Sequence, residues 1–216
     1  MMMRALASLV LAIASSWAGE TDVIFKDDFR GGLAGGWTWL REDPASWRAN
    51  ERGLEIRVLP GNMWGRSNNA TNILVRPVPD PTIRPIAVSV TVSNQPSGQY
   101  EQADLVWFYD ESHMVKIGQE RVDGVLCLVM GREKADKTKT LAKIPITALS
   151  LELKLVAHGD TVKGQYRPAG ENGWRDAAGC TLPKKGEPKV SLQVYQGPRD
   201  AMHWARFSAF QITRGK

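Results

Sequence analysis

Four polar residues lie inside two neighbouring apolar runs of this chain, at spacings that could bring their side chains together. Gln102 and Asp104 belong to the run 102–109, and Lys116 and Glu120 belong to the run that follows it. In an extended strand, residues separated by an even number project from the same face. An amide, an ammonium and carboxylates on one face could fix the hydroxyl groups of a ligand, and two carboxylates could also form an acid–base pair.

Four further residues could complete such a surface from other segments: Trp64, Arg76, Gln193 and Tyr195. Trp64 lies in a polar, glycine-containing segment, and Gln193 and Tyr195 alternate with apolar residues in a late run. Because aromatic rings stack on ligands, we expect Trp64 and Tyr195 to supply stacking faces. We expect Arg76 and Lys116 to donate hydrogen bonds, and Gln193 to fix hydroxyl groups with the other amide and the carboxylates.

The elements that must position these residues have the pattern of β-strands. Residues 54–58 and 86–92 alternate apolar and polar side chains with the period of two that a half-buried strand has. Turn residues such as Asp123-Gly124 separate the runs, as in β-hairpins. Roughly a dozen such runs recur at the spacing of a sandwich or barrel, and only residues 44–50 suggest a short helical turn. We therefore predict an all-β fold, a single antiparallel two-sheet β-sandwich.

The N-terminal residues have the pattern of a secretory signal peptide. Arg4 supplies a positive charge, residues 5–13 are apolar, and residues 16–18 end in the small-residue pattern of a cleavage site. The apolar stretch is shorter than the about 20 residues that a membrane span needs. We predict a signal peptide at 1–18, one domain at 19–216, no membrane span, and a secreted or periplasmic location.

Composition and motif content argue against several classes of function. The formal net charge is only +5, and acidic residues interrupt the basic run 132–143, so we expect no nucleic-acid partner. The three histidines lack metal-ligand spacing and no phosphate-binding or nucleophile motif occurs, so we expect neither a metal nor a cofactor. Cys127 and Cys180 could pair in an oxidising compartment, although Cys127 has the apolar surroundings of a core residue.

A series of short motifs gives the chain a family resemblance. They comprise Trp37, Trp39, Arg41, Glu42, Pro44 and Trp47; Gly53-Leu54-Glu55-Ile56; Tyr100-Glu101-Gln102-Ala103 and Leu105; Val115-Lys116, Gly118 and Glu120; Asp123-Gly124; Leu153 and Leu155; Trp174; and Phe207, Phe210 and Ile212. In their order and spacing the chain resembles the concanavalin A-like β-sandwich domains, and more closely a secreted domain-of-unknown-function family related to the C-terminal module of β-xylosidases. The resemblance implies a curved jelly-roll sandwich of a class that often binds carbohydrate across its concave sheet. The family usually has Gly where this chain has Asp104, which makes that sheet face more polar.

These observations leave three functions open. The first, which we favour, is an exported, non-catalytic, lectin-like domain that binds carbohydrate or another extracellular polymer. The second is a glycan-active hydrolase with Asp104 and Glu120 as its acid pair, although a lysine beside a glutamate lowers the carboxyl pKa and suits a structural pair better than a general acid. The third is an interaction or structural domain in which Lys116 and Glu120 form an internal ion pair.

Overall fold

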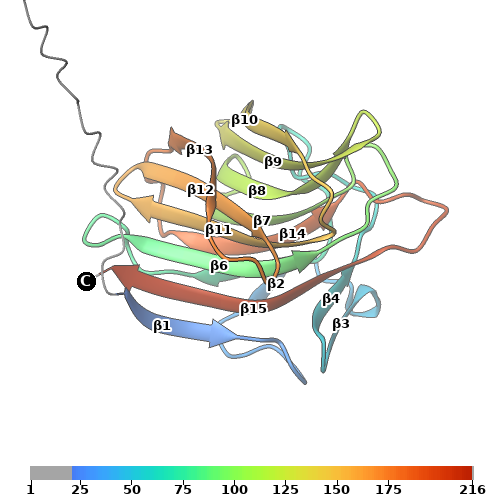
Figure 1. The fold of residues 1–216 in the computed structure, drawn as a ribbon, viewed down its shortest axis with the longest axis horizontal. Coiled ribbons are helices and arrows are strands. Elements are labelled where there is room, and N and C mark those ends of the chain that lie inside the picture. The colour runs from blue at the N-terminus through green and yellow to red at the C-terminus, as the bar shows by residue number, and fades with distance from the viewer. Residues whose placement is uncertain (1–20, 216) are drawn as a thin grey trace, which may run out of the picture.

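The structure is a computed structural model that describes residues 21–215, and within that range it is a sandwich of two antiparallel sheets (Figure 1). Sheet A comprises β1 (Thr21–Asp27), β3 (Trp47–Asn50), β4 (Gly53–Arg57), β6 (Ile86–Ser93), β11 (Ser150–His158), β12 (Thr161–Pro168), β13 (Arg175–Thr181) and β15 (Trp204–Gly215). Sheet B comprises β2 (Thr38–Leu40), β5 (Ile73–Pro77), β7 (Gln102–Asp110), β8 (His113–Val122), β9 (Val125–Lys134), β10 (Lys137–Pro145) and β14 (Lys189–Tyr195). A single turn of 3-10 helix, η1 (Pro44–Ser46), precedes β3.

The strand order confirms the predicted all-β, two-sheet sandwich. Sheet A runs β13-β12-β11-β6-β15-β4-β3, with β1 paired to β15, and sheet B runs β10-β9-β8-β7-β14-β5-β2. Asp123 and Gly124 both have positive φ, 51° and 79°, and form the tight turn predicted between β8 and β9. The predicted signal peptide, residues 1–18, lies outside the described residues and stays a prediction.

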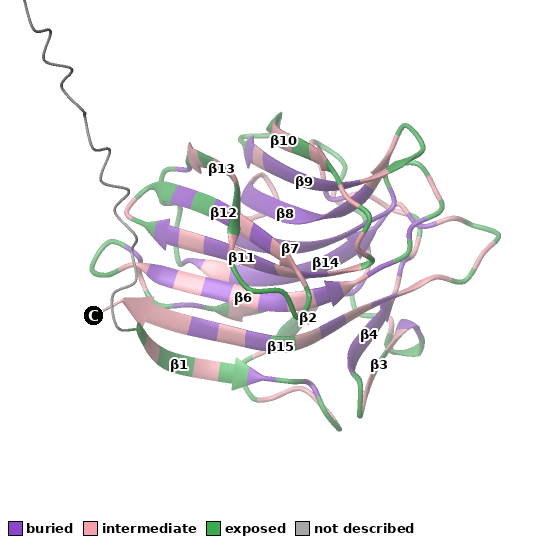
Figure 2. Cartoon of the chain, viewed as in Figure 1, coloured by how far each residue is buried: buried purple, intermediate pink, exposed green. Residues whose placement is uncertain are grey.

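The main core lies between the sheets and follows from the period-two alternation of the strands. Along β6, Val88, Val90 and Val92 are buried while the residues between them are partly exposed. Figure 2 shows this alternation along β6 and β11. Burying each such aliphatic side chain stabilises the fold by about 1.5–3 kcal/mol.

Sheet B differs from sheet A because its central strands are buried on both faces. Every residue of β7 except Asp110 is buried, and β8 is buried from Met114 to Glu120 (Figure 2). A second apolar cluster, which includes Met63, Val106 and Phe108, lies on the face of sheet B that points away from sheet A, called here the outer face. A segment outside the sheets must therefore cover that face.

The covering segment is the connection between β4 and β5, residues 59–72, called here the crossing loop. The backbone N–H of Gln196, just after β14, donates to Gly61 O at 3.1 Å. At the other side of the sheet, Gly65 N–H donates to Glu133 Oε2 of β9 at 2.9 Å. Met63 is fully buried between these two points. The loop thus reaches across sheet B rather than extending into solvent.

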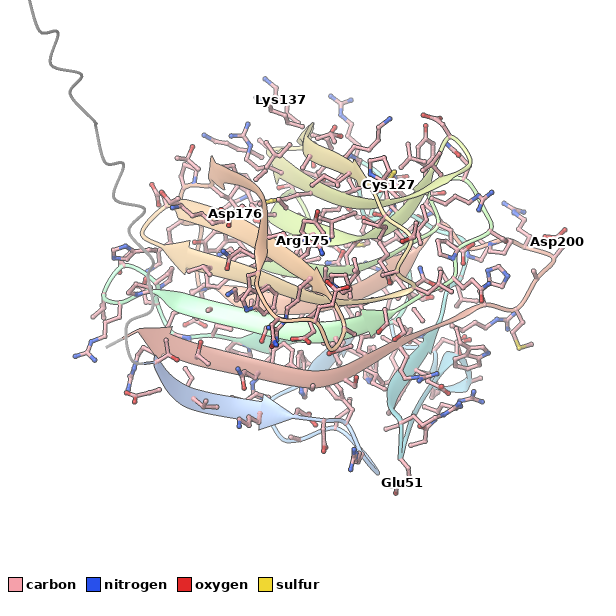
Figure 3. The ribbon with its side chains drawn as sticks, in the orientation of Figure 1. Glu51, Cys127, Lys137, Arg175, Asp176 and Asp200 are labelled. Carbon is pink, nitrogen blue, oxygen red and sulfur yellow. The ribbon has the colours of Figure 1, made fainter. Side chains whose placement is uncertain are left out.

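The two cysteines lie in different sheets and are both free. Cys127 is in β9 of sheet B, where it is labelled in Figure 3, and Cys180 is in β13 of sheet A. Burial raises the pKa of both thiols, to about 11 for Cys180. The sequence analysis allowed a disulfide between these two cysteines, and the structure does not contain it.

Candidate ligand-binding pocket

The alternation within β7 and β8 separates core residues from polar ones. Ala103 and Leu105 pack in the core between the sheets, so Gln102 projects from the outer face. Gln102 lies directly opposite Glu120 in the antiparallel register, and Lys116 shares the face of Glu120. The structure thus brings together three of the polar residues on which the sequence analysis concentrated.

Lys116 is the centre of this polar cluster. Its ammonium donates to Glu120 Oε2 at 3.0 Å and to the side-chain oxygen of Gln102. The same nitrogen lies 4.8 Å from the centroid of the Trp64 ring and 5.8 Å from that of Tyr195. Lys116 is only 3% exposed and Glu120 only 7%. A buried ion pair needs such additional hydrogen bonds to offset its desolvation, and they hold donor and acceptor in one fixed geometry.

Trp64 reaches the cluster because β9 has a glycine beneath it. A Cβ atom at Gly131 would lie 2.6 Å from the indole ring of Trp64, closer than van der Waals contact allows. The carboxyl of Glu133 then holds the next residue of the loop, Gly65, by its backbone N–H. Burial raises the pKa of Glu133 to about 7. The position of the Trp64 ring is therefore set by both sheet B and the crossing loop.

Asp104 belongs to the same face but lies beneath the surface. It is fully buried opposite Gly118, where a Cβ atom would lie only 2.0 Å from its Oδ1 atom. Burial raises the pKa of Asp104 to about 7, against the opposing attraction of Lys116. The phenol of Tyr195 beside it is also fully buried, and burial raises its pKa well above the ordinary value.

A pocket of about 310 Å³ opens beside this cluster, between the crossing loop and one end of sheet B. The residues that line it are Asn62, Trp64, Tyr100, Gln102, Lys116, Glu120, Val122, Val129, Thr140, Lys143 and Gln196. Four of the predicted site residues, Trp64, Gln102, Lys116 and Glu120, are therefore brought to one cavity. Its volume is at the lower end of the range of about 300–1,000 Å³ typical of small-molecule sites.

Tyr100 is the most informative residue of the pocket that the sequence analysis did not select. The residue is 48% exposed and its backbone has φ +63°, an unusual conformation for a residue other than glycine. The turn is held by Glu101, whose carboxylate accepts the backbone N–H of Ser97 at 2.8 Å and of Gly98 at 2.9 Å. Such strain often marks a ligand site. Its place in a polar turn just before Gln102 was the available signal.

Besides the covered Asp104, three of the predicted residues do not reach the pocket, and the role expected of each of these three needs correction. Arg76 projects from the other face of β5, where its guanidinium lies 3.4 Å from the centroid of the Phe25 ring and donates to Gly35 O. Tyr195 is covered by the crossing loop and has no exposed ring to stack. Gln193 is fully buried and donates to Ser191 Oγ at 3.2 Å. Arg76 as a ligand donor, Gln193 as a partner for ligand hydroxyl groups and Tyr195 as a stacking face are therefore not supported by this geometry.

The residues that line the pocket do not include the two carboxyl groups that glycoside hydrolysis requires. A glycosidase places two carboxyl groups across the scissile bond, about 5–9.5 Å apart. Among the residues that line this pocket, Glu120 is the one carboxylate and it is paired with Lys116, while Asp104 is covered.

Residues 21–215 contain no group of three or more His, Cys, Asp or Glu side chains placed to hold a metal ion. In the same range, no helix has the length and apolar character needed to cross a membrane.

A second, more open hollow of about 730 Å³ lies on the other side of the crossing loop. It is lined by Trp39, Leu40, Arg41, Asn68, Val75, Phe108, Tyr109, Asp110, Glu111, Ser112 and Lys189. Arg41 and Glu111 form an ion pair across it, and Arg41 Nε also donates to Ala70 O at 2.6 Å. The outer face of sheet B is thus divided in two by the crossing loop.

Comparison with known proteins places this fold in a family. A search of curated proteins found no match. Among solved structures, the GH43 BlXynB protein from Bacillus licheniformis superimposes with a TM-score of 0.75 at 22% identity, over 87% of this chain and 38% of that one. A xylan β-1,4-xylosidase from Bacillus halodurans gives 0.74 at 21% identity, over 87% and 38%. A functionally unknown protein from Saccharomyces cerevisiae gives 0.67 at 16% identity, over 84% and 97%.

These likenesses concern the fold, since all three identities are low, and the chain spans less than half of the two bacterial proteins. The family assignment comes from the sequence. The profile of the β-xylosidase C-terminal concanavalin A-like domain matches residues 26–185, and the resemblance drawn from the sequence motifs is confirmed. Because the match covers well over half of the chain, the protein belongs to the family of β-xylosidase C-terminal concanavalin A-like domains.

Proposed function

We propose that this protein is an exported, non-catalytic domain that binds carbohydrate in the pocket beside Lys116. The observation that carries the proposal is a fixed donor and acceptor, Lys116 and Glu120, which lie beside the Trp64 ring and line one pocket with it and Tyr100. Sugars present apolar ring faces and rows of hydroxyl groups, so they are bound by aromatic rings together with a few oriented polar groups. The pocket has both.

The charge balance of the pocket favours a neutral sugar. The ammonium of Lys116 is offset by Glu120 at 3.0 Å, and that of Lys143 lies 3.8 Å from a carboxylate oxygen of Asp123. An acidic sugar would have to compete with both carboxylates. Since one similar structure is a xylan β-1,4-xylosidase, neutral xylose-containing glycans are the first ligands to test.

The other parts of the proposal have separate support. The non-catalytic role is supported by the single carboxylate among the residues that line the pocket. Export is supported by the signal-peptide pattern of residues 1–18 in the sequence. In that setting the domain would meet extracellular polymers rather than intracellular substrates.

The proposal is tested by screening residues 19–216 on a glycan array and measuring each hit by isothermal titration calorimetry. Trp64→Ala should weaken binding by at least tenfold because it removes a stacking ring. The matched control is Trp174→Ala. Trp174 is a half-buried tryptophan just before β13 of sheet A, and the ammonium nitrogen of Lys154 lies 4.0 Å from the centroid of its ring. No binding on the array, or equal binding by the two variants, would contradict the proposal.

One observation favours a second reading, an interaction domain without a small ligand. The Lys116–Glu120 pair is itself buried and hydrogen-bonded, as an internal structural pair would be. Silence across the array, together with strong coupling of the two residues in a double-mutant cycle of stability, would support this reading.

A further inference from the structure

We infer that the pocket recognises the end of a glycan chain, or a free sugar of one or two residues, and excludes the interior of a polymer. This inference rests on the proposed function and adds which part of the ligand is bound. It is carried by the crossing loop, which lies where an extended chain would lie if it ran across the strands of sheet B.

The contacts of the crossing loop can be followed from strand to strand. The loop begins beside β14, where Gln196 N–H donates to Gly61 O, and Met63 then packs in the cluster that contains Val106 of β7. The ring of Trp64 follows, over Gly131 of β9. Beyond it, a Cβ atom at Gly65 would lie 3.9 Å from the side chain of Thr138 in β10. The loop therefore obstructs a continuous path over the strands from β14 to β10.

The crossing loop is also fixed in place. Its two ends close on each other, because Asn69 N–H and Ala70 N–H donate to Asn62 O at 3.0 and 3.2 Å. Met63 is fully buried and Ala70 is 2% exposed, so the underside of the loop is part of an apolar core. A compact loop with joined ends and a buried face stays packed on the sheet and does not open as a lid.

The space that remains on the Lys116 side of the crossing loop is small. The pocket holds about 310 Å³, and the hollow of about 730 Å³ lies beyond the loop and is lined by different residues. A polymer that continued in both directions from the pocket would meet Trp64 and the loop on one side. A chain end, which continues in one direction only, avoids this clash.

The experiment compares ligands that differ only in their ends. Calorimetry would measure xylose, xylobiose, xylohexaose and a xylohexaose blocked with a bulky group at both ends, alongside the matching series for any other array hit. The expected result is that xylobiose binds within about threefold of xylohexaose, because only the terminal residues are contacted, and that blocking both ends weakens binding at least tenfold.

A second arm narrows the pocket without disturbing the core. Thr140 on β10 and Thr161 on β12 of sheet A are both exposed, and of these two only Thr140 lines the pocket. Thr140→Trp should weaken binding of xylobiose at least tenfold, and Thr161→Trp, the matched control, should leave it within about threefold of the unmodified protein.

The outcomes separate the two levels of the argument. Affinity that rises more than tenfold from xylobiose to xylohexaose, or binding that survives blocked ends, would overturn the chain-end inference while leaving carbohydrate binding intact. If no sugar of any series binds, the proposed function fails and the inference fails with it.

Discussion

The outer faces of the two sheets carry similar residues in opposite surroundings. On sheet A, Glu55 contacts Arg48 at 2.7 Å and Arg52 at 3.1 Å; the Glu55 side chain is 5% exposed, but those of the two arginines are 54% and 63% exposed. On sheet B, the Lys116 and Glu120 side chains are only 4% and 9% exposed. A pair with one exposed partner can adapt to solvent, whereas a pair in which both partners are buried is held in one geometry. The crossing loop, rather than the types of residue present, therefore distinguishes the outer face of sheet B from that of sheet A.

The sharpest way to test this comparison is to remove one partner of an ion pair on each sheet. Glu120→Ala leaves the Lys116 ammonium buried without its carboxylate, so the free energy of unfolding should fall by about 3–5 kcal/mol. The control is Glu152→Ala on sheet A, whose partner Arg167 lies at 2.6 Å in a more exposed place. It should cost about 1 kcal/mol or less.

Urea unfolding monitored by tryptophan fluorescence would measure both variants. Losses that agree within 1 kcal/mol would contradict the difference between the two faces, because they would mean that water reaches Lys116 as freely as it reaches Arg167.

The next effect concerns the loop that covers sheet B. Met63→Ala should lower the free energy of unfolding by about 2–5 kcal/mol, since the side chain is fully buried on the outer face. The control, Met202→Ala, alters a methionine that is 63% exposed and should change stability by less than about 0.5 kcal/mol. Equal stability of the two variants would show that the loop does not pack on the sheet.

The buried carboxyl of Asp104 predicts a pH dependence of stability. Its pKa is about 7 in the folded protein and 3.8 ordinarily, so between these values the folded state binds more protons than the unfolded chain. The stabilisation linked to this proton is therefore complete below about pH 4 and is lost as the pH rises to about 7. Asp104→Asn should remove a falling slope of up to about 1.4 kcal/mol per pH unit and make the protein more stable than the unmodified chain at pH 8.

Asp80→Asn is the matched control for that measurement. The contact with Lys184 lowers the pKa of Asp80 to about 2, so its contribution is lost only as the pH falls below about 4. Asp80→Asn should therefore leave the slope between pH 4 and pH 8 unchanged. Chemical unfolding from pH 4 to pH 8 would compare the three proteins. A slope in Asp104→Asn equal to that of the unmodified protein would contradict the assignment.

The smallest expected change in stability comes from Tyr100. Because its φ is +63°, Tyr100→Gly should relieve backbone strain and raise the free energy of unfolding by up to about 1 kcal/mol. The same variant should weaken glycan binding because it removes a ring from the pocket, whereas Tyr100→Phe should retain most of it. A loss of stability in Tyr100→Gly, with unchanged glycan affinity, would show that the ring is structural.

Local patterns in the sequence predicted the strands and the division of faces within them. The period of two predicted that Gln102 and Asp104 share one face of their strand, because alternation is a property of the strand itself. The structure then places Ala103 and Leu105, on the opposite face, in the core. The tight turn at Asp123 and Gly124 was predictable for the same reason, since it depends on adjacent residues only.

The rest of the site depends on contacts between distant segments. The crossing loop has no period, so nothing local indicated that it would cover Tyr195. Asp104 is buried because Gly118 on the next strand leaves room for its carboxyl. Arg76 lies on the face of β5 that packs against Phe25 of the first strand. Each of these placements is decided by a partner far away in the sequence.

The most direct test of the carbohydrate pocket is an NMR titration of isotope-labelled protein, residues 19–216, with the tightest-binding glycan from the array. We predict that the indole N–H signal of Trp64 and the backbone amide signals of Gln102, Lys116 and Glu120 move with ligand concentration, while the indole signal of Trp174 on sheet A stays in place. Shifts confined to sheet A, or no shift on either face, would contradict the account.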